Sequence, residues 1–184
     1  MPLTQLDPHA ALILIDLQKG IVAIPTATPS SEIVARSAEL AAAFRKRNLP
    51  VVLVNVTAGA PGRTDTPRPN FAFPDDWTEL VPELNPQPTD ILISKTSRGA
   101  FITTDLHAQL KAQNITQVFL AGIATSAGVE ATASSAHDHG YNVVFVTDAM
   151  TDRSPEAHAY RIETAFPRIG ETTTTANVLK ALRQ

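Results

Sequence analysis

The chain contains no cysteine, and this absence removes several kinds of chemistry at once. Without thiols it has no disulfides, no thiolate metal ligands and no cysteine nucleophile. Charge is also scarce: charged residues make up 18% of the 184 residues, and the formal net charge is −3. Because the sequence has no basic stripe, we expect neither a nucleic-acid partner nor electrostatic attraction to an anionic membrane.

Long apolar runs are missing as well. No run in the sequence approaches the ~20 residues that a membrane-spanning helix needs. The first ten residues have neither the charged region nor the apolar region of a secretory signal, so we expect a cytoplasmic protein without membrane association. The length and an apolar content of 43% are typical of one globular domain, which we expect to cover residues 1–184.

Short apolar runs alternate along the chain with segments of helical periodicity. The helical patterns begin near residues 30, 104, 126, 155 and 175. The apolar runs are expected to be strands, and they cover residues 11–15, 51–54, 91–93, 118–121, 141–146 and 168–173. Such runs suit parallel strands that are buried on both faces. The alternation therefore predicts an α/β fold with a doubly wound, mostly parallel sheet and helices on both of its faces.

Residues 57–88 differ from the rest of the chain because they hold half of its prolines and few apolar pairs. This composition predicts a long loop with one helical turn near residues 76–81. Long loops inside a compact domain usually have a function. We expect this one to act as a lid or as an oligomer contact.

Polar residues stand where the predicted strands end. Asp16 follows the first strand, Lys95 follows the third, and the corner at residues 122–128 follows the fourth. The carboxyl ends of parallel strands share one edge of a sheet, so these residues can converge there. A carboxyl beside an ammonium group can donate or accept a proton, depending on whether burial or the positive neighbour dominates its pKa. The alternatives are a capping role for Asp16 and a solvated surface position for Lys95.

The corner belongs to residues 118–130, VFLAGIATSAGVE, which read as a strand, a sharp turn at Gly122 and the start of a helix. The first backbone N–H groups of a helix are unpaired and can face a ligand. The corner residues expected to contact a substrate are Ile123, Ala124, Thr125 and Ser126. Ser126 has two further interpretations, as a helix N-cap and as a nucleophile, although no histidine is placed by the sequence to activate it.

Five segments together resemble the isochorismatase-like hydrolases, part of the cysteine hydrolase superfamily that includes nicotinamidases and N-carbamoylsarcosine amidases. The segments are ALILIDLQKG, ISKTSRGAF, GIATSAGVEATA, YNVVFVTDAMTD and PRIGE, in the order of the family. The resemblance implies a six-stranded Rossmann-like sheet with an Asp–Lys–Cys triad at its carboxyl edge. It also implies a homo-oligomer, either a dimer or a tetramer.

Three positions carry the catalytic part of this resemblance. Asp16 matches the family's strand-1 aspartate, and Lys95 matches the lysine of its K-x-x-x-x-A-F motif. Gly128 stands where the amidases of the family have their cysteine, as glycine does in true isochorismatases. The resemblance therefore implies non-covalent hydrolysis of an enol ether, in which protonated Asp16 gives its proton to the vinyl carbon and water completes the reaction. The alternatives are a catalytically silent scaffold and an amide hydrolase that uses another nucleophile.

Other residues of the matched motifs are candidates for binding the substrate. Arg98 lies inside the lysine motif and can pair with a substrate carboxylate through a bidentate contact. Arg63 and Arg68 in the proline-rich loop are alternatives for this role or simple surface residues. Gln18, two residues after Asp16, is expected to line the pocket, and Phe101 is expected either to line it or to belong to the core.

The same resemblance bears on backbone geometry and on metals. It implies a cis peptide bond between Ile123 and Ala124. Nicotinamidases carry an Asp-x-His cluster of metal ligands after the second strand, whereas this chain has Asn55-Val56-Thr57 there. We therefore expect a small-molecule substrate, with no metal and no cofactor.

Overall fold

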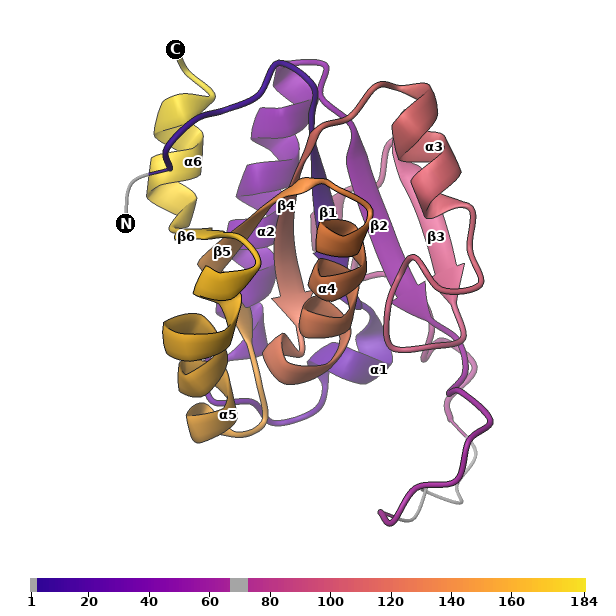
Figure 1. The fold of residues 1–184 in the computed structure, drawn as a ribbon. Helices are drawn as coiled ribbons and strands as arrows, with labels where there is room; N and C mark the ends of the chain where they lie inside the picture. Colours follow the sequence, from indigo (N-terminus) through magenta and orange to yellow (C-terminus); the bar gives the residue numbers. More distant parts are fainter. Residues whose placement is uncertain (1–2, 67–72) are drawn as a thin grey trace.

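The computed structural model of the chain describes residues 3–66 and 73–184. Its centre is a sheet of six strands in the order β3-β2-β1-β4-β5-β6, and every neighbouring pair is parallel (Figure 1). The α/β fold expected from the sequence is confirmed. Within the described ranges, no helix is both long enough and apolar enough to cross a membrane.

The strands fall where the apolar runs predict them, with different ends. They are β1 (Ala10–Ile15), β2 (Val51–Val56), β3 (Ile91–Lys95), β4 (Gln117–Ile123), β5 (Asn142–Thr151) and β6 (Glu171–Thr173). The α-helices are α1 (Lys19–Val22), α2 (Ser30–Lys46), α3 (Leu106–Ala112), α4 (Glu130–Asp138), α5 (Pro155–Tyr160) and α6 (Thr175–Ala181). Short 3₁₀ segments η1 (Pro82–Leu84) and η4 (Phe166–Arg168) and π segments η2 (Thr125–Val129) and η3 (Arg161–Ala165) complete the chain.

The sheet is buried on both faces, which explains why its central strands are apolar without alternation. In β1, Leu12 and Leu14 belong to the core cluster that contains residues of α2 and α6. Ile13 and Ile15 point the other way, into the cluster that contains residues of α3 and α4. Each side chain of β1 therefore has a helix layer to pack against.

The connections place a ligand-binding position next to β1. From β1 the chain moves outward through β2 to β3, and then crosses back to β4 on the other side of β1. This reversal creates a crevice outside the carboxyl ends of β1 and β4, where Ile15 pairs with Gly122. Asp16, the next residue after β1, lies at this crevice.

The sequence predicts a turn at Gly122, but in the structure this residue lies inside β4. Its φ is +117°, and the register against β5 shifts between Leu120 and Gly122. A β-carbon at this position would collide with the carbonyl oxygen of Ile15. Glycine therefore lets β4 approach β1 closely while the irregularity redirects the end of the strand.

The second half of the 57–88 loop is fixed to the body of the protein. The predicted helical turn near residues 76–81 is wrong, because the helical segment is η1, a few residues later. The Lys19 ammonium forms ion pairs with Asp76 and Glu79 at 3.0 and 2.7 Å. The indole of Trp77 occupies the space that a side chain at Gly20 would fill. These contacts anchor the loop to α1, beside the crevice.

Candidate active site

Asp16 and Lys95 reach the crevice from two strands. The Lys95 Nζ donates a hydrogen bond to Asp16 Oδ2 at 2.8 Å and a second one to the carbonyl oxygen of Ser97 at 3.2 Å. The side chains are only 8% (Asp16) and 2% (Lys95) exposed. The structure thus brings the two residues together as a buried ion pair, a state that depends strongly on both partners being present.

The carboxyl of Asp16 is poised between its two protonation states. Burial raises the pKa of Asp16 from its ordinary value of 3.8 to about 6, although the charge and the hydrogen bond of Lys95 act in the opposite direction. Its Oδ1 atom is buried and has no hydrogen-bond partner in the described part of the chain. A carboxyl with a pKa near neutral pH can serve as general acid or base, and Oδ1 remains available to a reacting group.

Gly128, in η2, faces this carboxyl. A β-carbon built on Gly128 would lie 3.2 Å from Asp16 Oδ2 and 2.8 Å from Ile15 Cγ2. Any side chain at position 128 would therefore contact the reactive carboxyl, and Ile15 would have to move to admit it. The site is closely packed around glycine.

These groups open onto a cavity of about 380 Å³, a size suited to a small molecule. Its walls combine small apolar residues with the Asp16–Lys95 pair and a few polar side chains. The lining residues are Asp16, Val56, Ala58, Gly59, Ala60, Thr64, Lys95, Ser97, Arg98, Ala127 and Gly128.

Arg98 is the lining residue suited to an anionic group of a ligand. Its side chain is exposed, and it forms no ion pair with the residues that the structure describes. Arg63 is also exposed but does not line the cavity. Arg68 lies outside the described residues.

The comparisons with known proteins agree with this arrangement. The family model of the isochorismatase domain matches residues 10–177. The chain belongs to the isochorismatase family. Members of this family are hydrolases, and the order of the strands and the placement of Asp16 and Lys95 at the crevice are consistent with membership.

Individual relatives match along nearly the whole chain. YwoC of Bacillus subtilis, an isochorismatase family protein of uncharacterized function, is 41% identical over 180 residues, which cover 94% of either protein. A solved structure of an isochorismatase family protein from Burkholderia thailandensis has a TM-score of 0.94 and 39% identity, covering 100% of this chain and 99% of that one. The ureidoacrylate amidohydrolase RutB of Variovorax paradoxus is 29% identical over 199 residues, which cover 90% of this chain and 79% of RutB.

Two predicted pocket residues of this isochorismatase family protein lie elsewhere. The buried side-chain amide of Gln18 donates to the carbonyl oxygens of Val56 and Trp77 at 3.0 and 3.1 Å and accepts from the Val56 N–H at 2.7 Å. The Gln18 side chain therefore bonds to the end of β2 beyond the last residue of β1, and it also bonds to the 57–88 loop at Trp77. Phe101 stacks on Tyr141 at 5.9 Å between ring centres and belongs to the core. The prediction that Gln18 lines the pocket is therefore wrong, and of the two alternatives for Phe101 the core position is the one observed.

The corner after β4 also differs from the sequence prediction. The expected cis peptide between Ile123 and Ala124 is confirmed. The N-cap is Ala124 and not Ser126, whose N–H donates to Asp152 Oδ2 at 2.7 Å. The buried Thr125 hydroxyl is paired with His158 Nδ1 at 2.8 Å. Because these groups bond inside the protein, residues 123–126 do not line the cavity, and the corner reaches it only through Ala127 and Gly128.

The sequence prediction does not include Asp152 in this corner. It directly follows β5, which ends later than predicted, and it accepts N–H groups from Ser126 and Ser154 at 2.7 and 3.3 Å. Burial opposes its ionisation, but hydrogen bonds led by the Ser126 N–H outweigh burial and hold the pKa of Asp152 below its ordinary value. The protein's own carboxylate therefore occupies the helix N-terminus that was expected to face the ligand. The second aspartate of TDAMTD is the signal that marks it.

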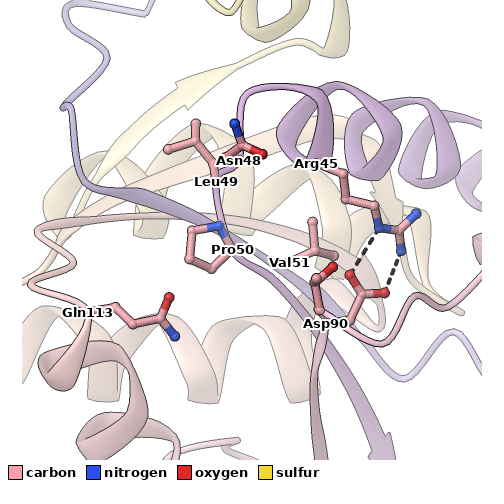
Figure 2. Close-up of a pocket in the computed structure, with 8 residues that line it drawn as sticks. Arg45, Asn48, Leu49, Pro50, Val51, Asp90 and Gln113 are labelled. Atoms are coloured by element: carbon pink, nitrogen blue, oxygen red, sulfur yellow. Dashed lines mark hydrogen bonds and ion pairs between the residues drawn. The ribbon is translucent and has the colours of Figure 1, made fainter.

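A second hollow, of about 250 Å³, lies at the amino ends of the strands, beside the start of β2. Figure 2 shows its charged residues, Arg45 and Asp90, facing each other as an ion pair, with a shortest distance of 2.7 Å. Arg45 also donates to the carbonyl oxygen of Leu84. Arg45 donates to both oxygens of the Asp90 carboxylate, at 3.0 and 2.7 Å, whereas Asp16 keeps one buried oxygen without a partner among the described residues. The candidate active site is therefore the cavity at Asp16.

Proposed function

We propose that this isochorismatase family protein hydrolyses an enol ether of the isochorismate type without a covalent intermediate. Asp16 acts as general acid and base, and Lys95 is its electrostatic partner. The observation that carries this proposal is the buried Asp16 carboxyl, whose Oδ2 is held by Lys95 while Oδ1 has no partner among the described residues. A carboxyl in this setting has a pKa of about 6, so it can hold a proton and release it near neutral pH.

The proposed reaction moves one proton from Asp16 to the substrate and a second proton from water to Asp16. The double-bond electrons of the substrate take the proton of Asp16 and form a C–H bond at the terminal vinyl carbon, while the O–H bond of Asp16 breaks. An oxocarbenium ion remains at the neighbouring carbon. Water adds its oxygen to that carbon and returns a proton to Asp16. In the resulting hemiketal the hydroxyl proton passes to the ether oxygen as the ether C–O bond breaks, and a ketone and an alcohol are released. Lys95 stabilises the carboxylate that Asp16 becomes after the first transfer.

Arg98 and the cavity walls define the proposed substrate class. A carboxylate on the substrate can pair with the Arg98 guanidinium through two parallel hydrogen bonds. The small side chains of Ala58, Ala60 and Ala127 leave space for a compact ring. We therefore propose a small carboxylate-bearing enol ether as substrate, handled in the cytoplasm by a homo-oligomer without metal or cofactor.

Amide hydrolysis is a second candidate, because the similar protein RutB is an amidohydrolase. This reaction would need a nucleophile other than cysteine. The Gly128→Cys variant tests whether the amidase geometry persists at this position. A reactive thiol or new amidase activity would support this candidate, and an inert thiol would count against it. Because Ile15 Cγ2 lies 2.8 Å from the β-carbon position, Gly128→Cys is best compared with the Gly128→Cys/Ile15→Ala double variant.

The direct test of the proposal is the rate of pyruvate release from isochorismate by the wild type and by Asp16→Asn. Loss of a general acid lowers such rates about 10²- to 10⁴-fold, and we expect a loss in that range. Arg98→Met is a matched variant at the rim, in which we expect a raised KM with a smaller change in kcat. Equal rates for wild type and Asp16→Asn on every enol ether and amide tested would leave the silent scaffold as the remaining interpretation.

A further inference from the structure

The strand β3, which carries Lys95 at its end, is the outermost strand on its side of the sheet (Figure 1). The opposite edge strand, β6, has only three residues, and its Glu171 accepts the N–H of Thr4. Proteins commonly protect a sheet edge by keeping it short or by placing charge on it. β6 follows this rule, whereas β3 has five residues and its one charged side chain points inward to Asp16.

The hydrogen bonds of β2 show which backbone groups of β3 point away from the sheet. The Thr57 N–H donates to the carbonyl oxygen of Lys95 at 2.9 Å, so Lys95 directs its backbone toward β2. Along a parallel ladder every second residue of a strand points the same way, so Ile91 and Ile93 also face β2. The N–H and C=O groups of Leu92 and Ser94 therefore point outward, and they have no partner in the described part of the chain.

The side chains of β3 divide in the same regular way. Ile93 is 4% exposed and belongs to the core, whereas Leu92 is 64% exposed on the other face of the sheet. Neither outward-facing position carries a charge or a proline, the residues that usually prevent edge pairing. The edge thus offers free hydrogen-bonding groups beside an exposed apolar side chain.

We propose that β3 pairs antiparallel with β3 of a second copy of this chain, with the two-fold axis at Ile93. In this register Leu92 lies opposite the partner's Ser94, and Ser94 lies opposite the partner's Leu92. Residues opposite each other in such a pair exchange both backbone hydrogen bonds, so every outward N–H and C=O of Leu92 and Ser94 is satisfied. The two Leu92 side chains meet diagonally on one face, at the ~7–8 Å spacing of such neighbours.

A second copy fits this edge because the edge is self-complementary. Its two outward residues are placed symmetrically about Ile93, so a two-fold rotation brings donors onto acceptors without a shift in register. The pairing also acts on the active site, because Ser94 precedes Lys95. Fixing the end of β3 in the dimer holds the ammonium that contacts Asp16.

The test is the molar mass by sedimentation equilibrium of the wild type, Leu92→Lys and Ser94→Pro. Ser94→Pro removes an N–H that makes no hydrogen bond with residues 3–66 or 73–184, and proline is tolerated at such edge positions. Ser94→Ala keeps this N–H, and Tyr160→Lys changes an exposed side chain on α5, so both serve as controls. We expect the two edge variants to have half the wild-type mass and the controls to keep it, with circular dichroism showing native folds throughout.

Amide hydrogen exchange distinguishes pairing at β3 from an indirect loss of assembly. In the wild type we expect slow exchange at Leu92 and Ser94 that becomes faster on dilution. In the Leu92→Lys monomer we expect fast exchange at the same amides, with Ile93 still protected by β2. A monomeric wild type, folded edge variants that keep the wild-type mass, or fast exchange at Leu92 and Ser94 in the wild type would each overturn the proposal.

Discussion

Asp16 owes its properties to two neighbours that act in opposite directions. Burial favours the neutral carboxyl, and the ammonium of Lys95 favours the carboxylate. Burial has the larger effect, so the pKa of Asp16 rises to about 6. The φ of Asp16 is 53°, in the left-handed region, and this change of backbone direction ends β1 at the crevice. At the scale of single residues, the site therefore has a carboxyl that can exchange a proton near neutral pH.

This raised pKa links stability to pH. Because the native state holds the Asp16 proton more tightly than the unfolded state, its contribution to the free energy of unfolding falls as pH rises from about 4 to about 6. The full fall is roughly 3 kcal/mol. Urea unfolding across this range should show it in the wild type and not in Asp16→Asn. Asp76→Asn, which removes an exposed carboxylate with a lowered pKa, is the control.

The opposing effect of Lys95 can be measured separately. Lys95→Met keeps most of the buried side-chain volume but removes the charge and the hydrogen bond that lower the pKa of Asp16. We expect the pKa of Asp16 to rise above 6 in this variant, as followed by carbon NMR of its carboxyl. An unchanged or lower pKa would show that Lys95 does not act on Asp16 in this way.

At the scale of elements, Asp152 holds the segment that presents Gly128. It binds the N–H of Ser126 at the start of η2, and in its absence this N–H loses its partner. We expect Asp152→Ala to lower the free energy of unfolding by about 1–3 kcal/mol and Asp152→Asn by less, since the amide oxygen can still accept. Chemical denaturation measures both changes. Glu156→Ala, at an exposed carboxylate of α5, should have a small effect, and an equal loss would contradict a specific role for Asp152.

Gly122 controls how closely β4 approaches β1. Gly122→Ala adds a β-carbon that collides with the Ile15 carbonyl oxygen, at a residue whose φ is +117°. Gly140→Ala is the matched control, because Gly140 also has a positive φ, +87°, but open space around it. We expect a cost of about 1 kcal/mol for Gly140→Ala and at least ~3 kcal/mol for Gly122→Ala. Equal melting temperatures for the two variants would contradict the close approach.

At the scale of the whole molecule, the fold and the central pair were predictable because they depend on local patterns. Apolar runs buried on both faces mark parallel strands, and the carboxyl ends of such strands share an edge, so Asp16 and Lys95 were expected to converge. The contacts of Gln18, Phe101 and Ser126 depend instead on where distant segments pack. The amide of Gln18 meets Trp77, Phe101 meets Tyr141, and the N–H of Ser126 meets Asp152. The spacing of residues along the chain does not contain this information.

The whole molecule also explains why one edge of the sheet holds the chemistry. The strand order reverses between β1 and β4, so a crevice forms there and receives Asp16 from β1 and Gly128 from the segment after β4. Lys95 comes from the outer strand β3. The site is thus assembled by strands from both halves of the sheet, and its geometry depends on the fold as a unit.

The pH dependence of kcat/KM for isochorismate hydrolysis tests the role of Asp16 most directly. If protonated Asp16 is the general acid, kcat/KM should be constant below a pH of about 6 and fall tenfold per pH unit above it. Asp16→Asn should lose this dependence together with most of the rate. A wild-type rate that does not change with pH across this range, or an Asp16→Asn variant with the wild-type profile, would contradict the assignment.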